Sequence, residues 1–578
     1  MSDFSPLDRA KINTHRSSFD LSSKKLFTAK VGEILPCYWQ IAIPDTKYRI
    51  SSDWFTRTVP VNTAAYTRIK EYYDFYAVPL RLISRALPQA FTQMTDYVTS
   101  ASSNSSNTAI LKDVPYSNLS DISSYFDNIY DKDYFDDVSF PLAYGSVKIL
   151  DMLGYGSFMS KESVSLGHVT ASYFGTNIAN PSDNPLIYSV SQRVNILPIL
   201  AYQKIYYDFF SNSQWEKHFA YAYNVDYWSG TTSIKPTVDM LKLRYANYPK
   251  DYFMGVLPSS QYGSVAVLPS VVPNLQSNAV AMSVDSSLAF HSPIQNPLSS
   301  NVVQASVQNG NGGVRYAFLN SDLSALSIRA TEYLQRWKEV VQFSSKDYSD
   351  QMAAQFGIKA PEYMGNHAHY IGGWSSVINI NEVLNTNLNT NDSHASIAGK
   401  GVGSNLGHTL TYDCGAEHQV IMCVYHAVPM LDWELSGQHP QLTVSAVSDF
   451  PQPAFDQLGM QPVPALNIHN NLSVQGTGNL GYNLRYWQWK SSVDTIHSGF
   501  RTQGGYSSWC AAVDGEEVLT EEALFSYQSF KVRPQQMNSI FLPQVSGSHS
   551  SVQYDQLLCN VNFQVYAVQN LDRNGLPY

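Results

Sequence analysis

Short stretches of alternating apolar and polar residues are scattered far apart along this chain of 578 residues. A period of two is typical of β-strands with one buried face. The clearest case lies near the C-terminus, where Cys559, Val561, Phe563 and Val565 alternate with polar residues. Further strand-like segments are predicted at residues 35–43, 69–79, 418–428 and 482–490. Because long segments separate them, the pattern favours a β-sandwich with large excursions over a series of hairpins.

Two stretches are instead typical of helices. Residues 199–222 are compatible with a helix that begins just after Pro198. Residues 323–343 repeat their apolar side chains at spacings of three and four, which predicts an amphipathic helix. The stripe consists of Leu326, Ala330, Leu334, Trp337 and Val341.

The surface is expected to be polar but weakly charged. Charged residues make up 15% of the chain, against about 25% in ordinary soluble proteins. Hydrophobic residues stand at 44%, which argues against disorder. The composition also excludes collagen, coiled-coil and membrane proteins, and no apolar run is long enough for a transmembrane helix. A surface of this kind suits a protein whose neighbours cover it.

The charge is unevenly distributed. The chain has 37 basic and 47 acidic residues, a net charge of −10, so its whole surface is not expected to bind nucleic acid. Residues 1–30, however, hold six basic and three acidic side chains. Lys11, Arg16, Lys24 and Lys25 in this N-terminal arm are therefore candidate phosphate contacts. The alternative is a solvated tail that crosses a neighbouring subunit.

The cysteines and the N-terminus point to a reducing cytosol. Five scattered cysteines do not form a disulfide framework. The first residues lack the basic and apolar regions of a signal peptide.

Three motifs suggest chemistry but have simpler explanations. Residues 476–481 match G-x-G-x-x-G, yet a strand pattern follows where a dinucleotide site needs a helix, so a turn is favoured. Cys414, His418, Cys423 and His426 lie close in sequence, but on one strand Cys423 would point away from both histidines. The acidic run at residues 121–137 does not fit a calcium loop, because Phe135 occupies a ligand position. No catalytic motif occurs, so no catalytic residue, cofactor or metal is predicted.

Residues 259–320 have a composition of their own. Their only charged residues are Asp285 and Arg315, and the remainder is rich in Ser, Asn, Gln, Val, Pro and Gly. A long segment without a clear period is often functional. We interpret it as an external excursion from the sandwich.

A series of short motifs runs through almost the entire chain in one order. They are RSSFDLS at 16–22, YYDFYAVP at 72–79, VNILP at 194–198, KDYF at 250–253, LQRW at 334–337, PEY at 361–363 and RNGLP at 573–577. Together they resemble the major capsid protein of Microviridae, the small single-stranded DNA phages, on the gokushovirus-like side of the family. Two departures suggest a divergent branch: Ser259 and Ser260 replace a common Trp-Pro, and the Gly-rich link after the LQRW helix is absent.

The resemblance implies a mainly β fold, an eight-stranded viral jelly roll with long inserted loops and a few helices. After the basic arm at 1–30, it implies a single capsid domain at 31–578 in which 259–320 forms a protrusion at the threefold axes. Such a protein is not an enzyme. It assembles with itself into a T=1 icosahedral shell around a circular single-stranded DNA genome. Further expected partners are a small basic DNA-binding internal protein and a host cell surface receptor, with no membrane insertion. The chain would be made in the host bacterial cytoplasm and reside in the virion.

Two other interpretations compete with the shell. One is a secreted β-sandwich that binds or cleaves glycans with exposed aromatic rings and paired carboxylates. The absence of a signal peptide and of an identifiable acid pair counts against it. The other is a tail or fibre adhesin, which would also lack enzymatic activity.

Overall fold

The structure is a computed structural model. It describes residues 15–61, 65–91, 114–122, 125, 142–156, 172–173, 176–177, 192–227, 233–267, 302–308, 314–320, 325–384, 397–470, 478–519, 525–541 and 555–573. Lys11, most of the acidic run at 121–137 and much of the 259–320 segment lie outside the described residues. In the described part, no helix combines the length and the apolar character needed to cross a membrane.

Long antiparallel strands form the largest part of the fold. In chain order they are β2 (Ser23–Ala29), β3 (Glu33–Ala42), β4 (Lys47–Thr58), β5 (Ile69–Pro79), β13 (His369–Leu384), β14 (Ile397–Leu406), β16 (Gln419–Pro429) and β21 (Leu557–Gln569). They pair into two rows, β2-β21-β4-β14 and β3-β16-β5-β13. β13 joins the rows, because it pairs with β5 up to Ile378 and with β14 from Asn379 onward.

This order matches the predicted fold class. Numbered along the chain, the rows read 1-8-3-6 and 2-7-4-5, so consecutive strands alternate between the rows in most steps. The mainly β class is confirmed, and the order is compatible with the eight-stranded jelly roll. Three of the predicted segments coincide closely with β3, β5 and β16, and the C-terminal alternation lies within β21.

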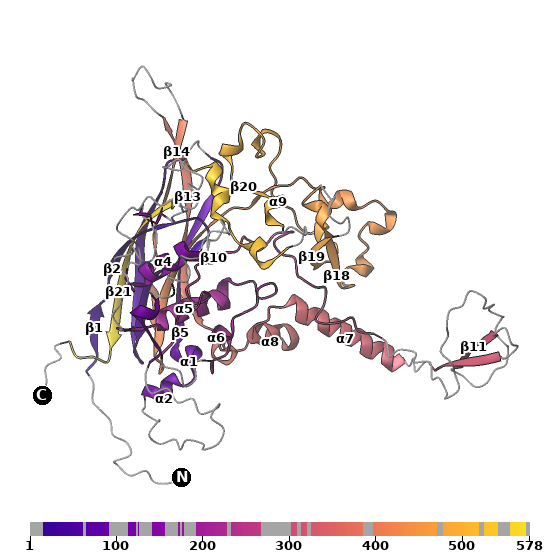
Figure 1. The fold of residues 1–578 in the computed structure, drawn as a ribbon, viewed down its shortest axis with the longest axis horizontal. Coiled ribbons are helices and arrows are strands. Elements are labelled where there is room, and N and C mark those ends of the chain that lie inside the picture. Colours follow the sequence, from indigo (N-terminus) through magenta and orange to yellow (C-terminus); the bar gives the residue numbers. More distant parts are fainter. Residues whose placement is uncertain are drawn as a thin grey trace, which may run out of the picture.

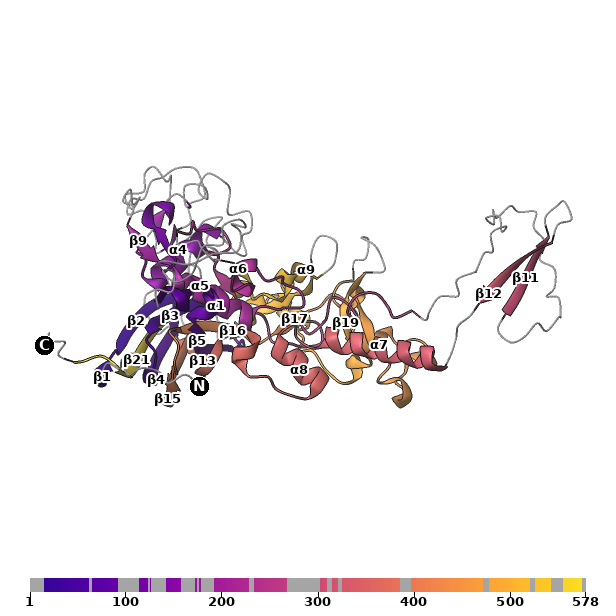
Figure 2. The same cartoon turned by 90° about the horizontal axis from the view of Figure 1, so that it is seen from below.

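Aromatic side chains fill the space between the two rows. Ring centroids lie 5.4 Å apart for Tyr38 and Phe563, and 4.9 Å apart for Trp54 and Tyr73. All four side chains are buried. Each pair joins a strand of one row to a strand of the other, so the rows pack face to face as a sandwich. Figures 1 and 2 show the strands gathered at one end of the molecule.

Short elements complete the fold. The helices are α1 (Leu80–Ile83), α2 (Leu87–Phe91), α4 (Leu142–Leu153), α5 (Leu197–Ile205), α6 (Ala220–Tyr223), α7 (Ala325–Phe343), α8 (Tyr348–Phe356) and α9 (Gly515–Val518). The remaining strands are β1 (Ser17–Asp20), β6 (Tyr116–Asn118), β7 (Ser172–Tyr173), β8 (Thr176–Asn177), β9 (Arg193–Asn195), β10 (Arg244–Tyr245), β11 (Val302–Gln308), β12 (Val314–Asn320), β15 (Leu410–Asp413), β17 (Asp432–Glu434), β18 (Met460–Pro464), β19 (Asn479–Leu484) and β20 (Ala512–Asp514).

Two sequence predictions are wrong in part. The helix predicted at 199–222 ends at Phe210, after a π-helical turn that follows α5. There the Asn212 side chain accepts a hydrogen bond from the Gln214 backbone N–H at 3.3 Å, a local contact that competes with a helix. The strand predicted at 482–490 ends at Leu484, because Tyr486 adopts a left-handed conformation at φ 60° before a 3₁₀ turn.

A buried ionic group fastens α4 to the sandwich. The Lys148 ammonium on α4 lies 2.6 Å from a Glu33 carboxylate oxygen and 2.9 Å from Asp555. Glu33 begins β3, and Asp555 stands just before β21. Burial by itself lowers the pKa of Lys148, but the two carboxylates more than offset this and raise it above its usual value. Lys148 therefore stays charged in an interior site.

Protonation of His426 on β16 should make the folded protein less stable in acid. Its ring stacks on Tyr72 at 4.7 Å, and Asp74 lies 3.9 Å from it. Burial lowers the pKa of His426 to about 3. Below pH 6.5 the unfolded chain therefore takes up a proton that the folded chain does not, and stability falls with acid. For His426→Phe, the loss of unfolding free energy between pH 7 and pH 5 should be smaller than in the parent by about 2 kcal/mol.

Urea unfolding of both proteins at the two pH values checks this difference. Burial also raises the pKa of Asp74 to about 6, and that contribution has the opposite sign because the folded chain then binds the extra proton. Asp74 is present in parent and variant, so the comparison isolates His426. Equal acid sensitivity of the two proteins would show that the imidazole contributes nothing.

Candidate nucleic-acid interface

One face of the row β2-β21-β4-β14 is turned away from the core. The alternation of β4 determines what this face displays, because its even-numbered residues from Tyr48 to Thr58 are buried. The intervening side chains are Lys47, Arg49, Ser51, Asp53, Phe55 and Arg57. On β21 the outward positions carry the three amides Asn560, Asn562 and Gln564 and the three apolar side chains Leu558, Tyr566 and Val568. We call this outward surface the sheet face.

Cations outnumber anions among the described residues of the sheet face. Lys24, Arg49, Arg57 and Lys400 are exposed on its strands. Lys47 forms an exposed ion pair with Asp413 at 3.3 Å. Asp53 on β4 is the other carboxylate among these described positions. A chain with a net charge of −10 therefore has a locally basic surface here.

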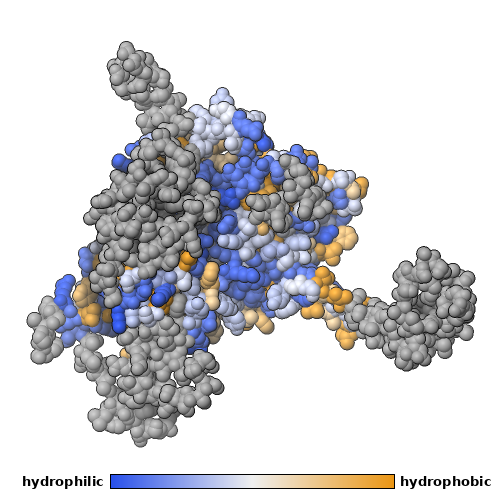
Figure 3. All heavy atoms as spheres, in the orientation of Figure 1, coloured by the Kyte–Doolittle hydropathy of each residue, from blue (hydrophilic) through white to orange (hydrophobic). Residues whose placement is uncertain are grey.

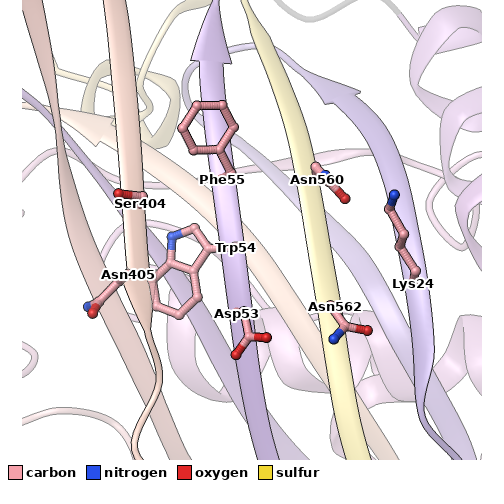
Figure 4. A pocket seen from close by; sticks show the side chains of 8 residues that line it. All are labelled: Lys24, Asp53, Trp54, Phe55, Ser404, Asn405, Asn560 and Asn562. Atoms are coloured by element: carbon pink, nitrogen blue, oxygen red, sulfur yellow. The ribbon is translucent and has the colours of Figure 1, made fainter.

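The sheet face contains two adjoining hollows. The first has a volume of about 730 Å³, and Figure 4 shows its side chains on four neighbouring strands. Its lining residues are Lys24, Asp53, Trp54, Phe55, Ser404, Asn405, Asn560 and Asn562. The second has a volume of about 530 Å³ and shares Phe55 and Asn560 with the first. The Arg57 guanidinium lies 4.9 Å from the centre of the Phe55 ring.

This arrangement can hold a single-stranded nucleic acid. Exposed rings offer a surface on which bases stack, and cations beside them bind phosphates. Phe55 is 36% exposed, so part of its ring is open to solvent. The amides of Asn560 and Asn562 can donate to and accept from base edges.

The structure describes three of the four predicted phosphate contacts, and their environments differ. Lys24 lines the first hollow. Lys25 is half-buried near Asp151. Burial raises the pKa of Asp151, and the positive charge of Lys25 partly offsets that rise. Arg16 forms an ion pair with Asp45 at 3.2 Å. Lys11 lies outside the described residues, so of the four only Lys24 is seen at the hollows.

The sequence prediction missed Arg49, Phe55 and Arg57. The available signal was a partial alternation in KYRISSDWFTRT at Lys47–Thr58, where the apolar Tyr48, Ile50 and Trp54 share one parity and the basic Lys47, Arg49 and Arg57 share the other. This pattern identifies an outward face with three cations and one aromatic ring.

One group of residues resembles a hydrolytic triad without its geometry. Ser436 Oγ lies 3.1 Å from His469 Nδ1, and a Glu516 oxygen lies 2.9 Å from that same nitrogen. In a working triad the serine and the acid contact opposite nitrogens of the imidazole. This group therefore lacks the arrangement of a catalytic triad.

The cysteines and histidines considered for a metal site contact different residues. Cys423 is fully buried, and the Cys37 thiol donates to its carbonyl oxygen. His426 stacks on Tyr72, and His418 stacks on Phe91. These side chains pack against different residues and do not converge on one point. Within the described ranges no group of His, Cys, Asp or Glu side chains could hold a metal ion.

The G-x-G-x-x-G motif leads into a strand. β19 begins at Asn479, within the motif, and pairs with β18. A dinucleotide site requires a helix at that position, so the motif does not form one.

A sandwich of eight antiparallel strands in this order is one of the architectures found in viral capsid proteins. Comparison with known families agrees: residues 179–571 match the family described as capsid protein (F protein), and the chain belongs to that family. The match covers more than half of the sequence and includes β13, β16 and β21.

A capsid protein from a phage is also similar to this chain. Capsid protein VP1 of Chlamydia phage 1 is 22% identical over 201 residues. This alignment covers 33% of the present chain and spans only 33% of the length of that relative. The expected resemblance to Microviridae major capsid proteins is confirmed, and the chain is a structural capsid protein. The family match argues against the two competing interpretations, a glycan-acting sandwich and an adhesin.

Proposed function

We propose that this chain forms a closed T=1 icosahedral shell around a circular single-stranded DNA genome, without enzymatic activity. The observation that carries the proposal is the basic sheet face on a sandwich of capsid-family type. A shell subunit needs a rigid fold, surfaces that contact other copies, and an inner face that tolerates DNA phosphates. The virion is then the place where the protein acts.

The DNA contact is assigned to the sheet face. Lys24 and Arg57 bind phosphates, and Phe55 accepts a base on its exposed ring. Arg16 and Lys25 are weaker candidates, and Lys11, outside the described residues, remains a candidate from its charge alone. Because the whole chain is acidic, a small basic internal protein supplies much of the remaining neutralisation.

The 259–320 segment is assigned to the outer surface, where it meets a host receptor. Figures 1 and 2 show the β11–β12 hairpin apart from the body of the molecule, beyond the N-terminal end of α7. An arm of this kind suits a protrusion. Three copies would meet at a threefold axis, since the segment has few charges to repel one another.

Particle formation tests the shell. The purified chain, expressed alone, should form closed particles of uniform diameter in negative-stain micrographs, made of a single polypeptide. Their sedimentation should correspond to 60 copies, the number in a T=1 shell. A stable monomer at all concentrations would contradict the proposal, and open sheets or tubes would contradict its T=1 symmetry.

A further inference from the structure

Helix α7 presents its apolar side to solvent. Leu326 is 76% exposed, Tyr333 is 69% exposed, and Leu334 and Trp337 are each 46% exposed. Together with exposed Ala330, these side chains form one stripe along the helix. We call them the α7 row. Figure 3 shows apolar surface gathered over this part of the molecule.

The polar side of α7 makes most of the helix's hydrogen bonds to the rest of the chain, while in the row the Trp337 indole N–H donates to Gln355 on α8 at 3.3 Å. The Gln335 side chain donates to Gln261 at 2.5 Å, and the backbone N–H of Ala266 donates to Gln335 at 3.1 Å. The Lys338 ammonium donates to the Ser264 carbonyl at 2.5 Å. A surface helix normally buries its apolar stripe and exposes its polar side, so α7 is inverted with respect to its own fold.

An apolar row that stays this exposed fits a contact with another molecule. Tyrosine and tryptophan are the residue types that contribute most to protein interfaces. The row contains no charged side chain, so a second copy can cover it without burying an unpaired charge. Because the chain belongs to a capsid protein family, another copy of the same chain is the expected partner.

We propose that a second copy of this chain covers the α7 row in the assembled shell. The inference rests on the proposed function and specifies one of its contact surfaces. The neighbour buries Leu334 and Trp337 at the C-terminal end of the row, and the single chain is left with an exposed stripe until assembly.

Substitutions at Leu334 test the contact. Leu334→Glu should raise the protein concentration needed for assembly at least tenfold, while Leu334→Met should assemble like the parent because it keeps an apolar side chain of similar volume. Sedimentation velocity measures assembly. Circular dichroism and thermal melting show whether both variants are folded, as expected for an exposed position. Equal assembly of the two variants would overturn the inference.

A cysteine at position 330 tests the same contact without preventing assembly. The five native cysteines are buried, so Ala330→Cys should provide the reactive thiol. A small maleimide should modify it rapidly in unassembled protein and at least tenfold more slowly in particles. Fast labelling in both states would show an open row, and slow labelling in both would show that the chain covers the row itself; either result overturns the inference. If the parent forms no particles, the proposed function fails first and the inference falls with it.

Discussion

Replacing Lys148 by methionine should lower the free energy of unfolding by about 3–5 kcal/mol. The ammonium lies within 3 Å of carboxylate oxygens of both Glu33 and Asp555, and its side chain is completely buried. Methionine fills a similar volume but removes the charge. Two carboxylates then stay in the interior without the cation nearest to them and with the buried Lys30 as the remaining positive charge beside them, so the cost exceeds that of an ordinary lost hydrogen bond.

Urea unfolding of the unassembled protein measures this loss, and Lys47→Met is the matched control. Lys47 pairs with Asp413 at 3.3 Å, but both side chains are more than half exposed. Solvent screens that pair, so its loss should cost no more than about 1 kcal/mol. If both variants were destabilised by the same small amount, the ionic group on α4 would not hold the sandwich together.

The strands of the sandwich could be predicted because burial on one or both faces determines their sequence pattern. β21 buries every second side chain and shows the alternation clearly, while the mostly buried β16 is an apolar run and the mostly buried β5 is dense in aromatic residues. The order of strands could not be obtained this way. Pairing of β4 with β21 joins residues about 500 positions apart, and alternation contains no information about such partners.

The character of the candidate surfaces was harder to predict for a different reason. The stripe of α7 was found from its period, but a period does not say whether the apolar side faces the core or another copy. The polar contacts of Gln335 and Lys338 decide that question, and they depend on where residues 261–266 lie. Lys24 was found from local charge, whereas Arg49 and Arg57 join it only after β2, β21 and β4 are aligned side by side.

Removing three cations from the sheet face should weaken binding of single-stranded DNA by about 100-fold at 0.1 M salt. The change is Lys24→Gln with Arg49→Gln and Arg57→Gln. Each phosphate contact on a single strand contributes about 0.7 to the slope of log affinity against log salt, which corresponds to about 5-fold in affinity at this concentration. The slope should therefore fall by about 2 when all three contacts are lost.

The measurement is fluorescence anisotropy of a labelled oligothymidine with unassembled protein over a range of salt concentrations. A matched triple variant, Lys217→Gln with Lys235→Gln and Lys250→Gln, removes the same net charge from exposed positions outside the sheet. If binding depended only on total charge, both triple variants would weaken it equally. Because local cations release counterions only where the strand lies, we expect the control to keep the parent slope, and equal slopes in all three proteins would place the DNA on another surface.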